Sequence, residues 1–193
     1  MLKSMTLEEE WVGEILSNHG YLTGSLALQV NRLTGAGFQG EEYAAGLIHD
    51  FGRSLLAVCL PEQFAAADPL TFIESSETLA QENIRLGTNH CSAGAWFADA
   101  NGLPQEFISV IQHHHSPASA VKNRRLVALT AVCDHMANHL QRHQCGDEYD
   151  IKANHALFVL ESCGVQNAAG RLEEQWPEIM RSALQMAQET CSF

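Results

Sequence analysis

Histidine and aspartate side chains recur along this chain in apolar surroundings. His49 and Asp50 are adjacent within an apolar run that begins at Ala44, and neither group is stable in a protein interior without a compensating partner. Neutral imidazole and carboxylate bind divalent metals, and a catalytic metal site gathers several of them from different elements. The sequence therefore predicts a site for one or two divalent ions (Fe, Mn, Zn or Mg) with these ligands: His49, Asp50, His90, His114, His115 and Asp134.

A structural interpretation of the same residues stays open. The chain has ten histidines in 193 residues, and histidines near helix ends are often ordinary surface or core groups. We expect this of His19, His135, His139, His143 and His155. Asp134 is expected to point inward, because Val127 and Ala131 share its helical face, so it needs a proton, a hydrogen bond or an ion. His49 and Asp50 also fit a structural pair without metal.

Three neighbours of these residues have simpler interpretations. Arg53 follows Asp50 by one turn and is expected to form a salt bridge with a carboxylate. Cys91 and Cys133 lie next to candidate ligands in sequence, but neither has an evident base to activate its thiol. We therefore interpret both cysteines as buried filler.

Helices must position these groups, because the sequence has no sustained two-residue alternation and no hairpin turn between β-branched runs. Pro61 ends one helix, Asp68 and Pro69 open another, and Asn89 caps the next. Helices are predicted over Leu7–Asn18, Ser25–Leu33, Glu41–Leu60, Asp68–Leu86, Asn89–Gly102, Leu103 to the histidine triplet 113–115, Ala120–His143, Ile151–Cys163, Val165–Leu172 and Trp176–Thr190, with a polar loop at Gln144–Glu148. The predicted fold class is all-α.

Composition and charge limit the kind of protein. With 46% hydrophobic and 18% charged residues, the chain fits one helical domain of residues 21–193, preceded by a helical segment of residues 1–20. The formal charge of −12 disfavours nucleic acid and anionic membranes as partners. The cysteines are scattered without a C-x-x-C pair, which favours reduced thiols, and no run has the length and apolarity of a membrane span. We expect a cytoplasmic protein.

Five stretches carry a family resemblance. They are Gly46–Gly52 with the Leu55-Leu56 and Leu60-Pro61-Glu62 that follow; Leu86-Gly87 with His90 and Gly94-Ala95; Gly102-Leu103-Pro104; Ile111 with His114-His115-Ser116-Pro117; and Val127–Asp134. Through these stretches, over about residues 24–164, the chain resembles the HDOD domain. This is an output domain of bacterial signalling proteins, related to the HD superfamily of metal-dependent phosphohydrolases. The resemblance implies a compact HD-type helical bundle and a role in bacterial signal transduction.

The chain departs from the family pattern at several positions. HD relatives carry a histidine on the helix before the His-Asp pair. If Ser25-Leu26-Ala27 aligns with the residues that follow this histidine in the family, Gly24 occupies the position of the histidine. His19 is not expected to replace it. Arg53 occupies the position at which the cyclic-dinucleotide phosphodiesterase branch has a lysine, and no Gly-Tyr-Pro follows His115. Hydrolysis of cyclic di-GMP is therefore not expected. The N-terminal lobe usual in the family is expected to be reduced.

Two functions follow from the resemblance and the residues. The first is a regulatory domain with an incomplete metal site, which binds a signalling protein or a small phosphorylated ligand and could form homo-oligomers. The alternative is a metal-dependent phosphohydrolase that uses the predicted ligands on a phosphoester or nucleotide. A third, weaker interpretation gives the metal only a structural role. Gly24 at the expected first-ligand position favours the regulatory domain.

Overall fold

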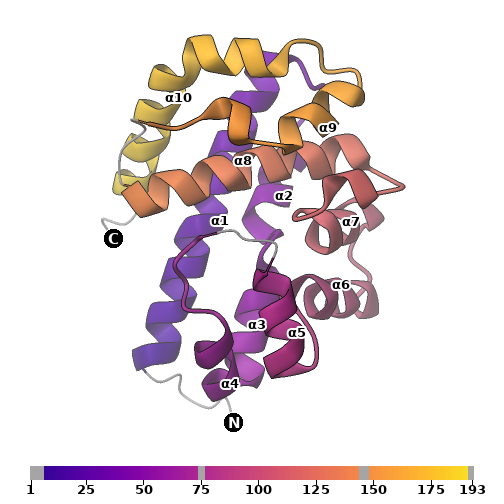
Figure 1. Ribbon diagram of the computed structural model, residues 1–193, viewed down its shortest axis with the longest axis vertical. Coiled ribbons are helices and arrows are strands. Elements are labelled where there is room, and N and C mark those ends of the chain that lie inside the picture. The colour runs from indigo at the N-terminus through magenta and orange to yellow at the C-terminus, as the bar shows by residue number, and fades with distance from the viewer. Residues whose placement is uncertain (1–6, 74–76, 144–147, 191–193) are drawn as a thin grey trace.

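The structure, a computed structural model, describes residues 7–73, 77–143 and 148–190. Every regular element in these ranges is a helix, so the all-α prediction is confirmed. Figure 1 shows the long helices α8 (Arg124–His143) and α10 (Ala168–Thr190) at one end of the molecule and shorter helices at the other, with α1 (Leu7–Thr34) running along its length. None of the described helices is long and apolar enough to cross a membrane. Most of the predicted loop Gln144–Glu148, together with Cys145 and Cys191, lies outside the described residues.

Helix α1 is continuous, so the predicted break between Leu7–Asn18 and Ser25–Leu33 is wrong. Gly20 does not end the helix; it lets another backbone approach, because a Cβ built on it would lie 2.6 Å from the carbonyl oxygen of Leu47. A Cβ on Gly46 would likewise lie 2.5 Å from the backbone nitrogen of Gly24. We call Gly20, Gly24 and Gly46 the glycine contact. It joins α1 to α2 (Glu41–Ile48) without a layer of side chains between them. The division of the chain at residue 20 stays a prediction.

The predicted helix Glu41–Leu60 is instead two helices, α2 and α3 (Phe51–Cys59). They are separated at His49 and Asp50, where Asp50 leaves helical geometry with φ −97° and ψ 14°. Consecutive residues of a regular helix point about 100° apart. With the helix interrupted here, Nε2 of His49 and Oδ2 of Asp50 lie 3.7 Å apart.

The segment after α3 also differs from the prediction. A short helix α4 (Pro61–Ala67) begins at Pro61, and residues 68–73 form no regular element, where the sequence predicts the start of a helix. Asp68 does not cap a helix because its carboxylate accepts hydrogen bonds from Arg53 and from the backbone of Leu70. The next helix, α5 (Thr78–Leu86), ends at Gly87 with φ 73°, where the sequence predicts a stop.

The helices that follow α5 can be compared with their predicted bounds in the same way. Asn89 caps α6 (His90–Ala100) through a hydrogen bond from the backbone of Ser92, as predicted, and α7 (Gln105–His113) leads into the histidine triplet. The predicted helix Ile151–Cys163 starts with a 3-10 turn before α9 (Ala156–Ser162). From Ala168 onward, the predicted segments Val165–Leu172 and Trp176–Thr190 form the single helix α10, which continues through Pro177, while residues 165–167 lie outside it. The main apolar core lies between α1, α8, α9 and α10.

Candidate metal centre

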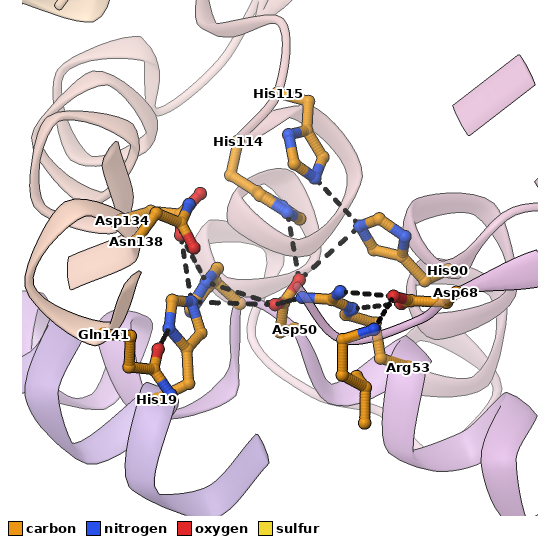
Figure 2. Close-up of polar contacts among 12 residues, drawn as sticks. His19, Asp50, Arg53, Asp68, His90, His114, His115, Asp134, Asn138 and Gln141 are labelled. Atoms are coloured by element: carbon orange, nitrogen blue, oxygen red, sulfur yellow. Dashed lines mark hydrogen bonds and ion pairs between the residues drawn. The ribbon is translucent and has the colours of Figure 1, made fainter. Parts of the chain in front are cut away.

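The predicted ligands converge around Asp50, at the junction of α2 and α3. Oδ1 of Asp50 lies 3.3 Å from Nε2 of His114 and 3.5 Å from Nε2 of His90. Oδ2 of the same carboxylate lies 3.7 Å from Nε2 of both His19 and His49. Figure 2 shows Asp50 between His19 on one side and His90 and His114 on the other. The two oxygens of one carboxylate therefore face two separate groups of imidazoles.

Asp134 and His115 complete the cluster. Oδ1 of Asp134 lies 3.0 Å from Nε2 of His19 and 3.4 Å from Nε2 of His49. Asp134 is 3% exposed, so the prediction that it points inward is confirmed. His115 lies at the opposite edge, with its Nε2 3.0 Å from Nε2 of His90. All the predicted ligands thus lie in one cluster, while their role as metal ligands stays a prediction.

His19 is the residue that sequence reasoning missed. It is fully buried, and its ligand atom lies within 4.8 Å of those of His49 and Asp134. Gly24 belongs to the glycine contact, so the register that placed it at the first-ligand position is wrong, and so is the expectation that His19 could not occupy the site. The buried residues Thr23 and Leu26 follow His19 at helical spacing, a signal that the predicted helix break concealed. Among the described residues, the following histidines join none of the candidate ligand groups, as expected: His135, His139, His143 and His155.

Backbone carbonyl groups orient two of the imidazoles. Nδ1 of His49 is 2.8 Å from the carbonyl oxygen of Gly46, and Nδ1 of His114 is 3.1 Å from that of Ile111. A carbonyl oxygen can only accept, so in each ring Nδ1 carries the hydrogen. When the ring is neutral, Nε2 then presents a lone pair toward Asp50, which is the tautomer that a metal ligand requires.

Side chains orient the other two imidazoles in the same sense. Nδ1 of His90 lies 2.8 Å from the carboxylate of Glu82, which also accepts a hydrogen bond from the His90 backbone at 2.8 Å. Glu82 is fully buried on α5. Nδ1 of His19 donates to Oε1 of Gln141 at 2.6 Å. A carboxylate behind a histidine is a recurring support of metal-bound imidazole, because it fixes the ring and raises its basicity.

This orientation favours a cation at the centre of the cluster. Nε2 of His49, Nε2 of His114 and Oδ1 of Asp50 are buried, yet none of them forms a hydrogen bond within the described part of the chain. A lone pair that faces a carboxylate oxygen is unfavourable unless a proton or an ion lies between them. Although burial lowers the pKa of His49, the charges of Asp50 and Asp134 outweigh it and raise the pKa overall. The residues therefore fit a divalent cation in both donor type and orientation.

Charge and burial set the protonation of Asp50, His114 and His115. Burial alone would raise the pKa of Asp50, but the charge of Arg53, followed by that of His49, holds this pKa well below its ordinary value. Burial lowers the pKa of His114 and, more strongly, that of His115. At neutral pH Asp50 is therefore an anion, and His114 and His115 are neutral. These are the forms that bind metal.

Arg53 forms the salt bridges that the sequence predicts. Its Nε and Nη2 donate to Asp68 at 2.7 and 2.9 Å, and its Nη1 donates to Oδ2 of Asp50 at 2.9 Å. The ring of Phe72 lies 5.3 Å from the guanidinium carbon and 4.8 Å from the ring of His19. Arg53 thus ties the irregular segment 68–73 to the centre of the cluster.

A cavity of about 730 Å³ opens beside His114 and His115. Its lining combines apolar side chains with these polar or basic ones: His135, Asn138, Arg142, Asn154 and His155. A second cavity of about 300 Å³ is lined in part by Arg53, Phe72 and His90. Guanidinium and imidazole groups can attract an anion to this region although the chain as a whole is acidic.

We expect Glu82→Gln to lower the affinity of the protein for divalent metal by about 10- to 100-fold, because the variant keeps the shape of the side chain but removes the charge behind His90. Calorimetric titration of the metal-free protein with Mn²⁺ or Zn²⁺ measures the change. Glu42→Gln is the matched control, since Glu42 is also buried and hydrogen-bonded, to Asn31 and Gly40, but joins no candidate ligand group. Equal affinities for the wild type and Glu82→Gln would show that Glu82 does not support a ligand.

Known proteins resemble this chain in sequence and in fold. The family model of the HDOD domain matches residues 2–117. An HDOD domain protein of unknown function from Geobacter sulfurreducens has a similar structure, with a TM-score of 0.65, 20% identity, and coverage of 87% of this chain and 61% of that one. A protein from Shewanella amazonensis, provisionally assigned as a phosphohydrolase, has a TM-score of 0.63 and 16% identity, with coverage of 97% of this chain and 66% of that one.

One sequence relative extends the comparison. An uncharacterised protein from Treponema pallidum is 27% identical over 124 residues, which are 62% of this chain and 24% of that protein. This chain thus spans about a quarter of that relative and less than two thirds of the length of the solved structures described above. At identities of 16% and 20%, the structural likeness shows a shared fold.

Proposed function

The chain belongs to the HDOD domain family, and from that premise we propose that it is a metal-dependent phosphohydrolase acting on a small phosphoester or nucleotide. One observation carries the proposal. The Nε2 atoms of His19 and His49 point to one oxygen of Asp50, and those of His90 and His114 point to the other. With His19 in the cluster, the argument for an incomplete site loses its basis.

The residues of the cluster have distinct roles in this proposal. His19, His49 and Asp134 would hold one ion, His90, His114 and His115 a second, and Asp50 would contact both. Two divalent cations supply Lewis acidity toward a phosphoryl group and lower the pKa of a water molecule. Glu82 and Gln141 hold the imidazole rings of His90 and His19 in position without reaching the reacting atoms themselves.

The cavity beside the cluster supports a small phosphorylated ligand. Arg142 and His155 are exposed on its lining and can contact a phosphate, while Ala131 and Val159 offer apolar contact to the rest of the ligand. The chain's charge of −12 argues against nucleic acid and anionic membranes. A cytoplasmic location is part of the proposal, and the described cysteines, all free, are consistent with a reducing compartment.

A regulatory domain is the second candidate, and the contact between Arg53 and Asp50 favours it. Nη1 of Arg53 lies 2.9 Å from Oδ2 of Asp50, the oxygen that faces His19 and His49. A fixed guanidinium at this oxygen neutralises part of the charge that would attract an ion. In this alternative the domain binds a signalling protein or a small phosphorylated ligand, alone or as a homo-oligomer, and turns over no substrate.

Metal analysis and a turnover screen separate the two candidates. We expect the purified protein to contain stoichiometric metal and to hydrolyse at least one member of a panel of phosphomonoesters, phosphodiesters and nucleotides with added Mn²⁺ or Fe²⁺. His19→Ala should lower turnover at least about tenfold, whereas His143→Ala, at an exposed histidine outside the cluster, should not. A correctly folded protein without metal and without turnover would instead support the regulatory domain.

A further inference from the structure

Cys91 lies within the cluster of candidate ligands rather than merely beside it in sequence. It follows His90 in the first turn of α6 and is 4% exposed. One ligand atom from each of His90, Cys91, His114 and His115 lies within 4.8 Å of the others. The thiol is free. The interpretation of Cys91 as filler does not account for a sulfur atom grouped with three imidazoles.

Cys133 provides a contrast within the same chain. It is also fully buried, also free, and adjacent in sequence to the predicted ligand Asp134. Even so, it belongs to none of the candidate ligand groups formed by the described residues. Burial and sequence proximity therefore do not by themselves bring a thiol into the cluster, whereas the position of Cys91 does.

The packing of α6 fixes this position. A Cβ built on Gly52 of α3 would lie 1.9 Å from the carbonyl oxygen of His90, so only glycine allows the start of α6 to approach α3 this closely. Asn89 caps the helix at the same point through its contact with the Ser92 backbone. The backbone at His90, the residue before Cys91, is thus held against Gly52 near the start of α3.

We infer that Cys91 is a thiolate ligand of the metal position formed by His90, His114 and His115, and that this position selects a soft divalent ion such as Zn²⁺ over Mg²⁺. The inference rests on the metal site of the proposed function. As the ion binds, the sulfur forms a bond to it and the thiol proton passes to solvent, since a coordinating thiol is deprotonated. Thiolate favours Zn²⁺ and other soft ions, whereas Mg²⁺ prefers carboxylate and water oxygens.

Cobalt(II) substitution of the 193-residue chain tests the inference without relying on turnover. Co²⁺ bound to thiolate shows a sulfur-to-metal charge-transfer absorption in the near ultraviolet, which imidazole and carboxylate ligands do not produce. We expect this band in the wild type and in Cys133→Ala, and its loss in Cys91→Ala. Zn²⁺ affinity should fall at least about tenfold in Cys91→Ala, while Mg²⁺ affinity stays unchanged.

A second measurement needs no variant. X-ray absorption at the zinc edge of the Zn²⁺-loaded wild type should show sulfur at about 2.3 Å together with nitrogen at about 2.0 Å. If the ion has only nitrogen and oxygen neighbours, or if Cys91→Ala keeps the cobalt charge-transfer band, the inference is wrong while the metal site of the proposed function stands. A protein that binds neither Co²⁺ nor Zn²⁺ would overturn both.

Discussion

Asp50→Asn is expected to abolish stoichiometric binding of divalent metal and to reduce phosphoester turnover by more than the roughly 100-fold that loss of an outer supporting group costs. Asp50 is the one carboxylate whose oxygens face imidazoles on both sides, within 3.3 to 3.7 Å, in the described part of the chain. An amide keeps the size of the side chain but replaces one of these oxygens with a nitrogen that has no lone pair to donate. Both metal positions would therefore lose a ligand or a charge from a single substitution.

Elemental analysis and the turnover screen measure this effect directly. Asp99→Asn is the control, because Asp99 is exposed on α6 and lies outside the cluster. In Asp50→Asn the amide oxygen of the new side chain can still accept the hydrogen bond from Arg53, so circular dichroism should show a folded variant. Full metal content in Asp50→Asn would mean that Asp50 serves only as the salt-bridge partner of Arg53.

Arg53→Ala is expected to lower the free energy of unfolding by about 3 to 5 kcal/mol, the usual cost of removing one partner from a buried ion pair. Arg53 is 8% exposed and its two carboxylate partners, Asp50 and Asp68, are 7% and 5% exposed. Without the guanidinium, both anions stay buried, and Asp68 loses two hydrogen bonds at once. The irregular segment 68–73 would also lose its link to α3.

Chemical denaturation followed by circular dichroism gives the magnitude. Arg53→Lys should recover only part of the loss, since an ammonium group keeps the charge but cannot form the paired contact with Asp68. Arg85→Ala, at an exposed arginine of α5, should change stability by no more than about 0.5 kcal/mol. A similarly small change in the free energy of unfolding of Arg53→Ala would contradict the buried network of ion pairs. The measurements should use metal-free protein, because a bound ion would stabilise the folded state and mask the result.

The sequence predicts the class of fold and most of the cluster, because the signals for both come from residues that are close together in the chain. Helical periodicity and the caps at Asn89 and Gly87 locate α6 and the end of α5. The apolar face around Asp134 correctly predicts its burial. These signals depend on residues within one or two helical turns of one another. They therefore do not depend on contacts with distant segments of the chain.

The errors concern contacts between distant segments. Whether Gly20 ends a helix or admits another backbone depends on Leu47, which no local pattern reveals. The interruption of the helix at Asp50 brings two ligands into the cluster, and no proline marks it. Gln141 supports His19 from 122 residues away, a separation at which spacing carries no information. His19 was missed for these reasons and not because its own surroundings are polar.

The glycine contact has a further consequence for tolerance to mutation. His19 belongs to α1 and His49 follows α2 directly, so the spacing of these two imidazoles depends on how closely the two backbones approach at Gly20, Gly24 and Gly46. With no side chains between the helices, no rotamer change can absorb an added methyl group, and the helices themselves must separate. Positions that carry no functional group at all are therefore as intolerant of substitution as the imidazoles whose distance they determine.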